Sequence, residues 1–160
     1  MSAAAWTTES HSARETIALG RRIGRAARPG DVATLVGELG SGKTRLAKGM
    51  AEGLGAASAR EVTSPSFVIC REYLGGRIPF YHLDAYRLRG EADLAAIGSD
   101  EVLAGDGLSA LEWADRAGGA LPPDHLEVRL EVTGRDARRL TFTPHGAQSE
   151  RLLEGVRSGG

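Results

Sequence analysis

The stretch Gly37-Glu38-Leu39-Gly40-Ser41-Gly42-Lys43-Thr44 decides how the rest of the sequence is interpreted. A short apolar run rich in β-branched residues, 32–36, precedes it, and an apolar stripe at helical spacing follows it until Gly53 and Gly55 end the pattern. Glycines at these spacings allow successive backbone N–H groups to turn towards one anion, at the positive end of the following helix. The order of strand, glycine-rich loop and helix therefore predicts a phosphate-binding loop of the P-loop type.

Two side chains at the end of this loop complete the expected phosphate site. Lys43 would reach the β- and γ-phosphates, because its compact ammonium fits a tight loop better than the planar guanidinium that this arginine-rich chain otherwise uses. Thr44 would offer its hydroxyl to Mg²⁺, which bridges the same phosphates. The alternative, a glycine-rich helix entry that matches by chance, is disfavoured by the correct context. The expected nucleotide-binding residues of the loop are Gly37, Leu39, Gly40, Ser41, Gly42, Lys43 and Thr44.

The base of the nucleotide is constrained by residue types that the chain lacks or hardly uses. The sequence contains no asparagine, so it has no Asn-Lys-x-Asp motif with which Ras-like proteins read guanine. The only glutamine, Gln148, lies in the C-terminal tail and not where such proteins orient the attacking water. The sequence therefore favours ATP, with Mg²⁺, over GTP.

Two carboxylates follow predicted strands and are the candidates for catalysis and for metal binding. Glu112 directly ends the apolar run 108–111, and Asp84 ends another strand-like segment. A magnesium–phosphate site needs such acids at the carboxyl ends of neighbouring strands, where they bind the metal or polarise the attacking water. The other interpretations are a surface ion pair for Glu112, and a helix N-cap or a partner for Arg87 in the case of Asp84. His82 shares a strand face with Asp84, although a lone histidine is more often structural.

The remaining pattern predicts one domain, residues 1–160, of the α/β class: a three-layer P-loop fold whose mixed sheet has a parallel core, an antiparallel hairpin and late strands. The capping-box spacing from Ser12 to Glu15 starts the first helix. The tail after Gly146 is either a weak helix or frayed. Helices are expected at 13–28, 91–97 and 100–104, and strands at 67–73, 77–83, 108–111, 126–132 and 140–143.

Bulk composition limits the partners and the compartment. The net charge of −1 gives no global field that would attract RNA, so any tRNA contact should be indirect. The single Cys70 cannot form an internal disulfide, and the N-terminus shows no apolar stretch typical of a signal peptide or membrane span. We therefore expect a cytoplasmic protein with no membrane contact.

Four motifs in order give the sequence a family resemblance. The phosphate loop is followed by Thr63-Ser64-Pro65-Ser66-Phe67, then by His82-Leu83-Asp84-Ala85-Tyr86-Arg87, and then by Glu112-Trp113. Together they resemble the TsaE family, the ATPase subunit of bacterial tRNA threonylcarbamoyladenosine biosynthesis. The resemblance extends from the first helix to Ala137-Arg138.

The resemblance implies roles for particular residues of this chain. Thr44 and Glu112 would be associated with Mg²⁺, residues 63–67 would act like a switch, and residues 82–87 would border the nucleotide. Ser12 and the Ala137-Arg138 region would flank the adenine. Two departures are Ser66, where the family more often has threonine, and Asp115, where it often has glutamate.

The resemblance also implies a function. The chain would hydrolyse ATP slowly and would switch or reset the complex that transfers threonylcarbamoyl to adenosine 37 of tRNAs reading codons that begin with A. Its partners would be the transferase subunit, of the TsaD type, and that subunit's dimerising paralogue, of the TsaB type. Two alternatives remain open: a small P-loop kinase in which Arg87 or Arg89 serves the acceptor pocket, and a module that binds a nucleotide without useful turnover.

Overall fold

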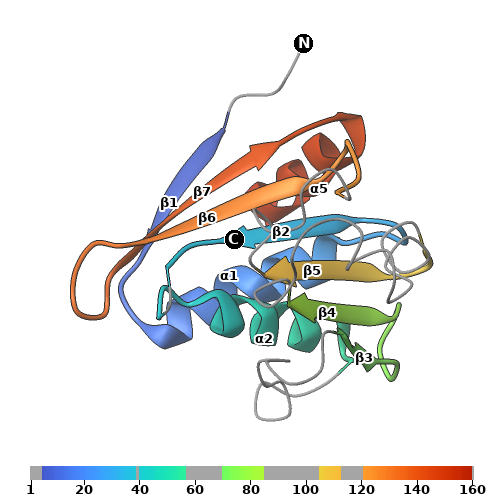
Figure 1. Ribbon diagram of the computed structural model, residues 1–160, viewed down its shortest axis with the longest axis horizontal. Helices are drawn as coiled ribbons and strands as arrows, with labels where there is room; N and C mark the ends of the chain where they lie inside the picture. The colour runs from blue at the N-terminus through green and yellow to red at the C-terminus, as the bar shows by residue number, and fades with distance from the viewer. Residues whose placement is uncertain (1–4, 39, 57–69, 85–104, 113–120, 160) are drawn as a thin grey trace.

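The computed structural model describes residues 5–38, 40–56, 70–84, 105–112 and 121–159. Within them one seven-stranded sheet has the order β1-β7-β6-β2-β5-β4-β3 (Figure 1). The strands are β1 Trp6–Ser10, β2 Val32–Val36, β3 Cys70–Tyr73, β4 Phe80–Asp84, β5 Leu108–Glu112, β6 Leu126–Val132 and β7 Arg138–Pro144; the helices are α1 Ala13–Ala26, α2 Lys43–Leu54 and α5 Ala147–Ser158.

The sheet is mixed, as the sequence predicts. Strand β2 lies at its centre and runs parallel to β5 and β6, and β4 runs parallel to β5. Strand β3 is antiparallel to β4, which confirms the hairpin around Gly75-Gly76, and the late strands β6 and β7 are also antiparallel. The α/β class with a parallel core is therefore confirmed.

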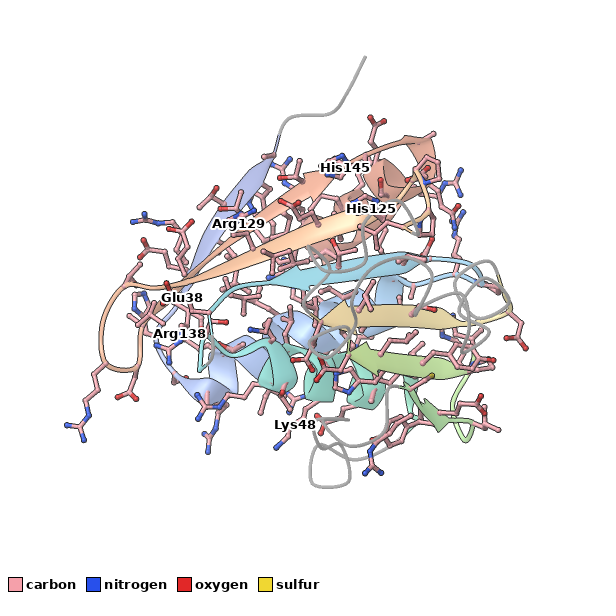
Figure 2. All side chains as sticks on the ribbon, viewed as in Figure 1. Glu38, Lys48, His125, Arg129, Arg138 and His145 are labelled. Atoms are coloured by element: carbon pink, nitrogen blue, oxygen red, sulfur yellow. The ribbon has the colours of Figure 1, made fainter. Side chains whose placement is uncertain are left out.

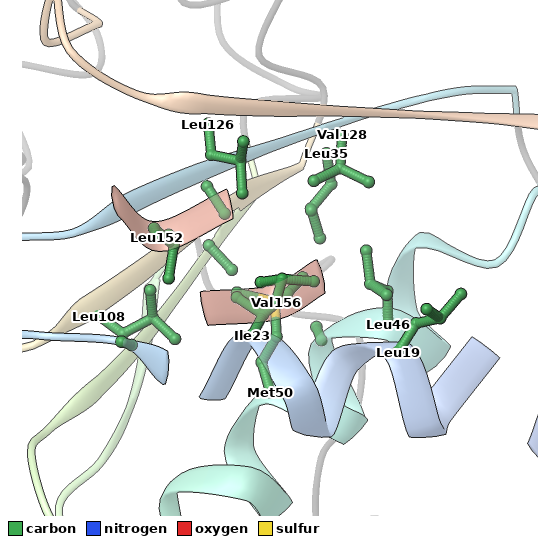
Figure 3. Packing of buried hydrophobic residues seen from close by; sticks show 14 of the residues in the cluster. Leu19, Ile23, Leu35, Leu46, Met50, Leu108, Leu126, Val128, Leu152 and Val156 are labelled. Atoms are coloured by element: carbon green, nitrogen blue, oxygen red, sulfur yellow. The ribbon is translucent and has the colours of Figure 1, made fainter. Parts of the chain in front are cut away.

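Three helices cover one face of this sheet. The core between them joins Ile23 of α1, Met50 of α2 and Val156 of α5 to Leu35 and Val128 of the sheet (Figure 3). Side chains on the opposite face, such as Leu83 and Leu111, are buried as well. The predicted third layer, like the helices predicted at 91–97 and 100–104, falls on residues outside the described ranges.

Helices α1 and α2 approach each other through glycines. A Cβ atom on Gly49 would lie 2.0 Å from the Ile17 carbonyl oxygen, and one on Gly20 would lie 2.2 Å from the Leu46 carbonyl oxygen. The expectation that Gly53 ends the second helix is wrong, because Gly53 lies inside α2, where a Cβ would meet the Arg21 carbonyl oxygen at 2.3 Å. These glycines serve packing: without side chains, the two backbones come into direct contact.

The tail after Gly146 forms helix α5, and its buried face holds Leu152 and Val156 against the core. The N-cap Gly146 has no side chain to cap the helix. Asp124 does so from the segment before β6, because its carboxylate accepts the backbone N–H groups of Gln148 at 2.8 Å and Ser149 at 2.9 Å. Burial opposes ionisation, but the hydrogen bonds with Ser149 and Gln148 outweigh it and lower the pKa of Asp124.

This cap predicts a pH-dependent contribution to stability. Asp124→Ala should lower the free energy of unfolding by about 1 kcal/mol at neutral pH, the usual cost of losing a helix cap. Because the folded-state pKa is lowered, the charge contribution is present above the unfolded value of about 4 and is lost as pH falls through the folded value. Thermal melts at several pH values measure this, with Glu154→Ala, an exposed carboxylate of the same helix, as the control. A difference that grows on acidification would contradict the role.

Candidate nucleotide site

The backbone of the phosphate loop has the geometry that its glycines suggest. Gly42, the N-cap of α2, has φ 106°, a left-handed conformation that side chains disfavour. A Cβ on Gly37 would lie 2.5 Å from the Ser41 hydroxyl and 2.7 Å from the Leu130 carbonyl oxygen, so this position admits no side chain. Leu39 lies outside the described residues. The loop therefore packs tightly against β6 and leads directly into the N-terminus of α2.

Polar groups gather along this loop. The Lys43 ammonium donates to the carbonyl oxygens of Gly37 and Glu38, the latter at 3.1 Å, although its side chain is largely buried. The Ser41 hydroxyl is also buried, and it has no hydrogen-bond partner among the described residues. Thr44 is half-buried in the first turn of α2. An anion held by this loop would meet the ammonium and backbone N–H groups at a helix N-terminus.

The two candidate carboxylates are brought together by strand pairing. Asp84 and Glu112 end β4 and β5 and are direct partners in the parallel register. Glu112 also pairs with Leu35, two residues before Gly37. The two acids therefore lie at the carboxyl ends of the parallel strands, where the phosphate loop begins. Their residues are only 8% and 3% exposed. This burial argues against the alternative in which Glu112 belongs to a surface ion pair.

His82 adds a contact that the sequence did not specify. Its Nε2 atom hydrogen-bonds the Glu112 carboxylate, and both side chains are buried. The ring stacks on Phe80 with a centroid distance of 6.1 Å. The shared face of His82 and Asp84 was readable from their spacing, but the bond to Glu112 depends on β5 lying next to β4. His82 therefore fixes one carboxylate oxygen of Glu112.

The residues expected at the adenine, Ser12 and the Ala137-Arg138 region, lie on adjacent segments. Pairing of β1 with β7 sets Ser10 opposite Arg138, which places the start of α1 beside the turn that contains Ala137. Ser12 is the N-cap of α1 and accepts the Glu15 N–H at 3.1 Å, so the predicted helix start is confirmed. The roles of Ser12 and Ala137 towards a base remain predictions.

The oxygen donors of this site suit magnesium. Two carboxylates and the Thr44 hydroxyl are hard ligands, and Mg²⁺ keeps several waters beside a few such groups. Within the described ranges no group of three or more His, Cys, Asp or Glu side chains could hold a metal ion, so a cage built only from such ligands is not seen there. The motif residues 63–67, 85–87, Arg89, Trp113 and Asp115 lie outside the described residues.

The strand, glycine-rich loop and helix, with acids on the neighbouring strands, define a P-loop α/β protein. The family model described as threonylcarbamoyl adenosine biosynthesis protein TsaE matches residues 10–140. This chain belongs to the TsaE family.

Individual relatives agree with this assignment. The TsaE protein of Bacillus subtilis is 43% identical over 140 residues, covering 88% of this chain and 86% of that protein. The TsaE protein of Streptomyces coelicolor is 40% identical over 134 residues, covering 80% and 89%. The crystal structure of Bacillus subtilis YdiB superposes with a TM-score of 0.82 at 36% identity and covers 98% of this chain and 96% of that one. No helix among the described residues is long and apolar enough to cross a membrane.

Proposed function

We propose that this protein binds ATP with Mg²⁺, hydrolyses it slowly, and serves as the ATPase subunit in the threonylcarbamoyl modification of tRNA adenosine. The observation that carries the proposal is the buried pair Asp84 and Glu112, in register beside the start of the phosphate loop. Membership in the TsaE family supports the assignment of the protein to threonylcarbamoyladenosine biosynthesis.

Each residue of the site has a distinct task in this proposal. The loop from Gly37 to Thr44 holds the phosphates through backbone N–H groups, and Lys43 neutralises the β- and γ-phosphate oxygens. Glu112, held by His82, would accept a hydrogen bond from the attacking water, and Asp84 stands beside it. Thr44, Glu112 and Asp84 would hold Mg²⁺, which would supply positive charge to offset the negative charge that develops during transfer.

The partners proposed are proteins of the TsaD and TsaB types. Hydrolysis in this subunit would switch or reset the transferase complex, since γ-phosphate contacts commonly order loops that relax when the phosphate leaves. With a net charge of −1 the chain has no global field to hold tRNA, so the tRNA contact would be indirect. A role in tRNA modification supports a cytoplasmic location for the protein.

Phosphate release measured with and without the TsaD- and TsaB-type partners tests this function. We expect slow release by the subunit alone, faster release in the complex, and loss of tRNA modification when the subunit is omitted. Transfer of phosphate to a small acceptor would indicate a kinase instead. Nucleotide binding with no turnover under any condition would leave only a binding module.

The preference of the site for ATP over GTP gives a second test of the proposed function. Because the chain lacks asparagine and hence the usual guanine-reading motif, ATP should compete for the site better than GTP. A competition assay with a fluorescent ADP analogue measures the preference. Equal or tighter binding of GTP would contradict it.

A further inference from the structure

Arg138, the first residue of β7, connects two loops through its guanidinium. Nε donates to the Ser41 carbonyl oxygen at 3.1 Å and Nη2 donates to the Gly40 carbonyl oxygen at 3.2 Å, both in the phosphate loop. Nη1 donates to Ala137 at 2.8 Å and Gly134 at 3.2 Å, carbonyls of the β6–β7 turn. Figure 2 shows Arg138 near Glu38, far from His125 and His145 at the other end of the sheet.

The two bonds to the phosphate loop determine which way its peptide groups face. In a trans peptide the C=O and the following N–H point in opposite directions. When Arg138 holds the carbonyls of Gly40 and Ser41, the N–H groups of Ser41 and Gly42 are turned away from it. The Ser41 N–H does point into the loop, where it donates to the Glu38 carbonyl oxygen at 3.0 Å.

We infer that Arg138 is a positioning residue: it orients the Gly40 and Ser41 peptide groups so that the loop is organised for phosphate before nucleotide binds, and it links this loop to the β6–β7 turn. The inference rests on the proposed nucleotide function and gives Arg138 a task at the phosphate loop, apart from the place beside the adenine that the family resemblance implies. A loop already held in its binding geometry loses less conformational freedom on binding, which raises affinity.

The planar fork of the guanidinium is essential to this role. It presents five N–H donors in fixed directions, and in this structure all three nitrogens donate to carbonyls of the two loops. A lysine ammonium carries the same charge at a single point and cannot reproduce this bridge. Arg138→Lys therefore separates positioning from simple attraction between a positive charge and phosphate.

The experiment measures ADP affinity by calorimetry for Arg138→Lys and Arg138→Gln, at a temperature where circular dichroism shows each variant folded. We expect both to bind at least about tenfold more weakly, which corresponds to about 1.4 kcal/mol. The control is Arg139→Gln: this neighbour is 47% exposed and its guanidinium lies 3.5 Å from Glu9. It should stay within about twofold of the parent chain. Amide hydrogen exchange of the peptide covering 37–43 should be faster in the Arg138 variants without nucleotide.

Four results would overturn the inference. Parent-level affinity in Arg138→Lys would show that charge alone suffices. Arg138 variants with a lower melting temperature but unchanged ADP affinity and unchanged amide exchange in 37–43 would show that Arg138 only stabilises the β6–β7 turn. If the parent chain binds ADP, Lys43→Ala binds it more weakly and both Arg138 variants bind it with the parent affinity, the inference fails but the proposed function stands. Absence of ADP binding by the parent chain would overturn both.

Discussion

Replacing Glu112 with glutamine should slow ATP hydrolysis by about 100-fold or more, the usual scale for a positioned acid–base group. Glutamine keeps the shape of the side chain and an oxygen that accepts a hydrogen bond from His82, but it removes the negative charge that would hold a metal or polarise water. Folding should be retained, because the buried contact can still form. The measurement is phosphate release in the partner complex, with a thermal melt on the same preparation.

Glu127→Gln is a matched control for this variant. Glu127 lies on β6, is half-buried, and its carboxylate lies 3.9 Å from the Arg129 guanidinium, so its loss should leave turnover unchanged and cost under about 1 kcal/mol of stability. A Glu112→Gln protein with a normal rate and normal magnesium dependence would remove Glu112 from the chemistry and transfer the role to Asp84.

Gly49→Ala should have the largest effect on stability. The new methyl group would lie 2.0 Å from the Ile17 carbonyl oxygen and 2.9 Å from the Gly20 Cα, both backbone atoms that cannot rotate away. Helices α1 and α2 would have to separate, which we expect to cost about 3 kcal/mol, more than the roughly 1 kcal/mol that alanine gains in helix propensity. The net loss of about 2 kcal/mol should lower the melting temperature by about 4–8 °C.

Arg45→Ala tests whether this loss comes from packing. Arg45 is exposed on the same helix and alanine is the same incoming residue, so this variant should melt within a few degrees of the parent chain. A stable Gly49→Ala protein would show that the two helices are not in backbone contact.

Features encoded in short sequence patterns were predictable. The β-branched run of β2 and the glycine loop are adjacent in sequence, and the Ser12 cap marks the start of α1 within one turn. Strand β1 was not predicted, because Trp6-Thr7-Thr8-Glu9-Ser10 is polar and becomes a strand by pairing with β7 at the edge of the sheet. For a similar reason the sequence does not decide between a helix and a frayed tail after Gly146, since the residue that caps this helix, Asp124, comes from another segment.

In the candidate site, too, some features could be predicted from the sequence and others could not. The loop residues and the two acids could be named from motifs, but the sequence does not give the strand order that makes Asp84 and Glu112 direct neighbours. Nor could it give the contact of His82 with Glu112 or the two carbonyl bonds from Arg138 to the phosphate loop, which join residues far apart in the chain. Gly53 was misread because a glycine near a helix end suggests a stop, whereas here it allows close approach to Arg21.

The central claim is that the loop from Gly37 to Thr44 binds ATP, and calorimetric titration of Mg-ATP into the parent chain and Lys43→Ala tests it most directly. The variant removes the ammonium and leaves the backbone of the loop, so the parent chain should bind one nucleotide and the variant should bind at least about tenfold more weakly, an effect of about 1.4 kcal/mol or more. Lys48→Ala, the only other lysine, is the control and should bind normally. Equal affinity in the parent chain and Lys43→Ala, or no binding by the parent chain, would contradict the account.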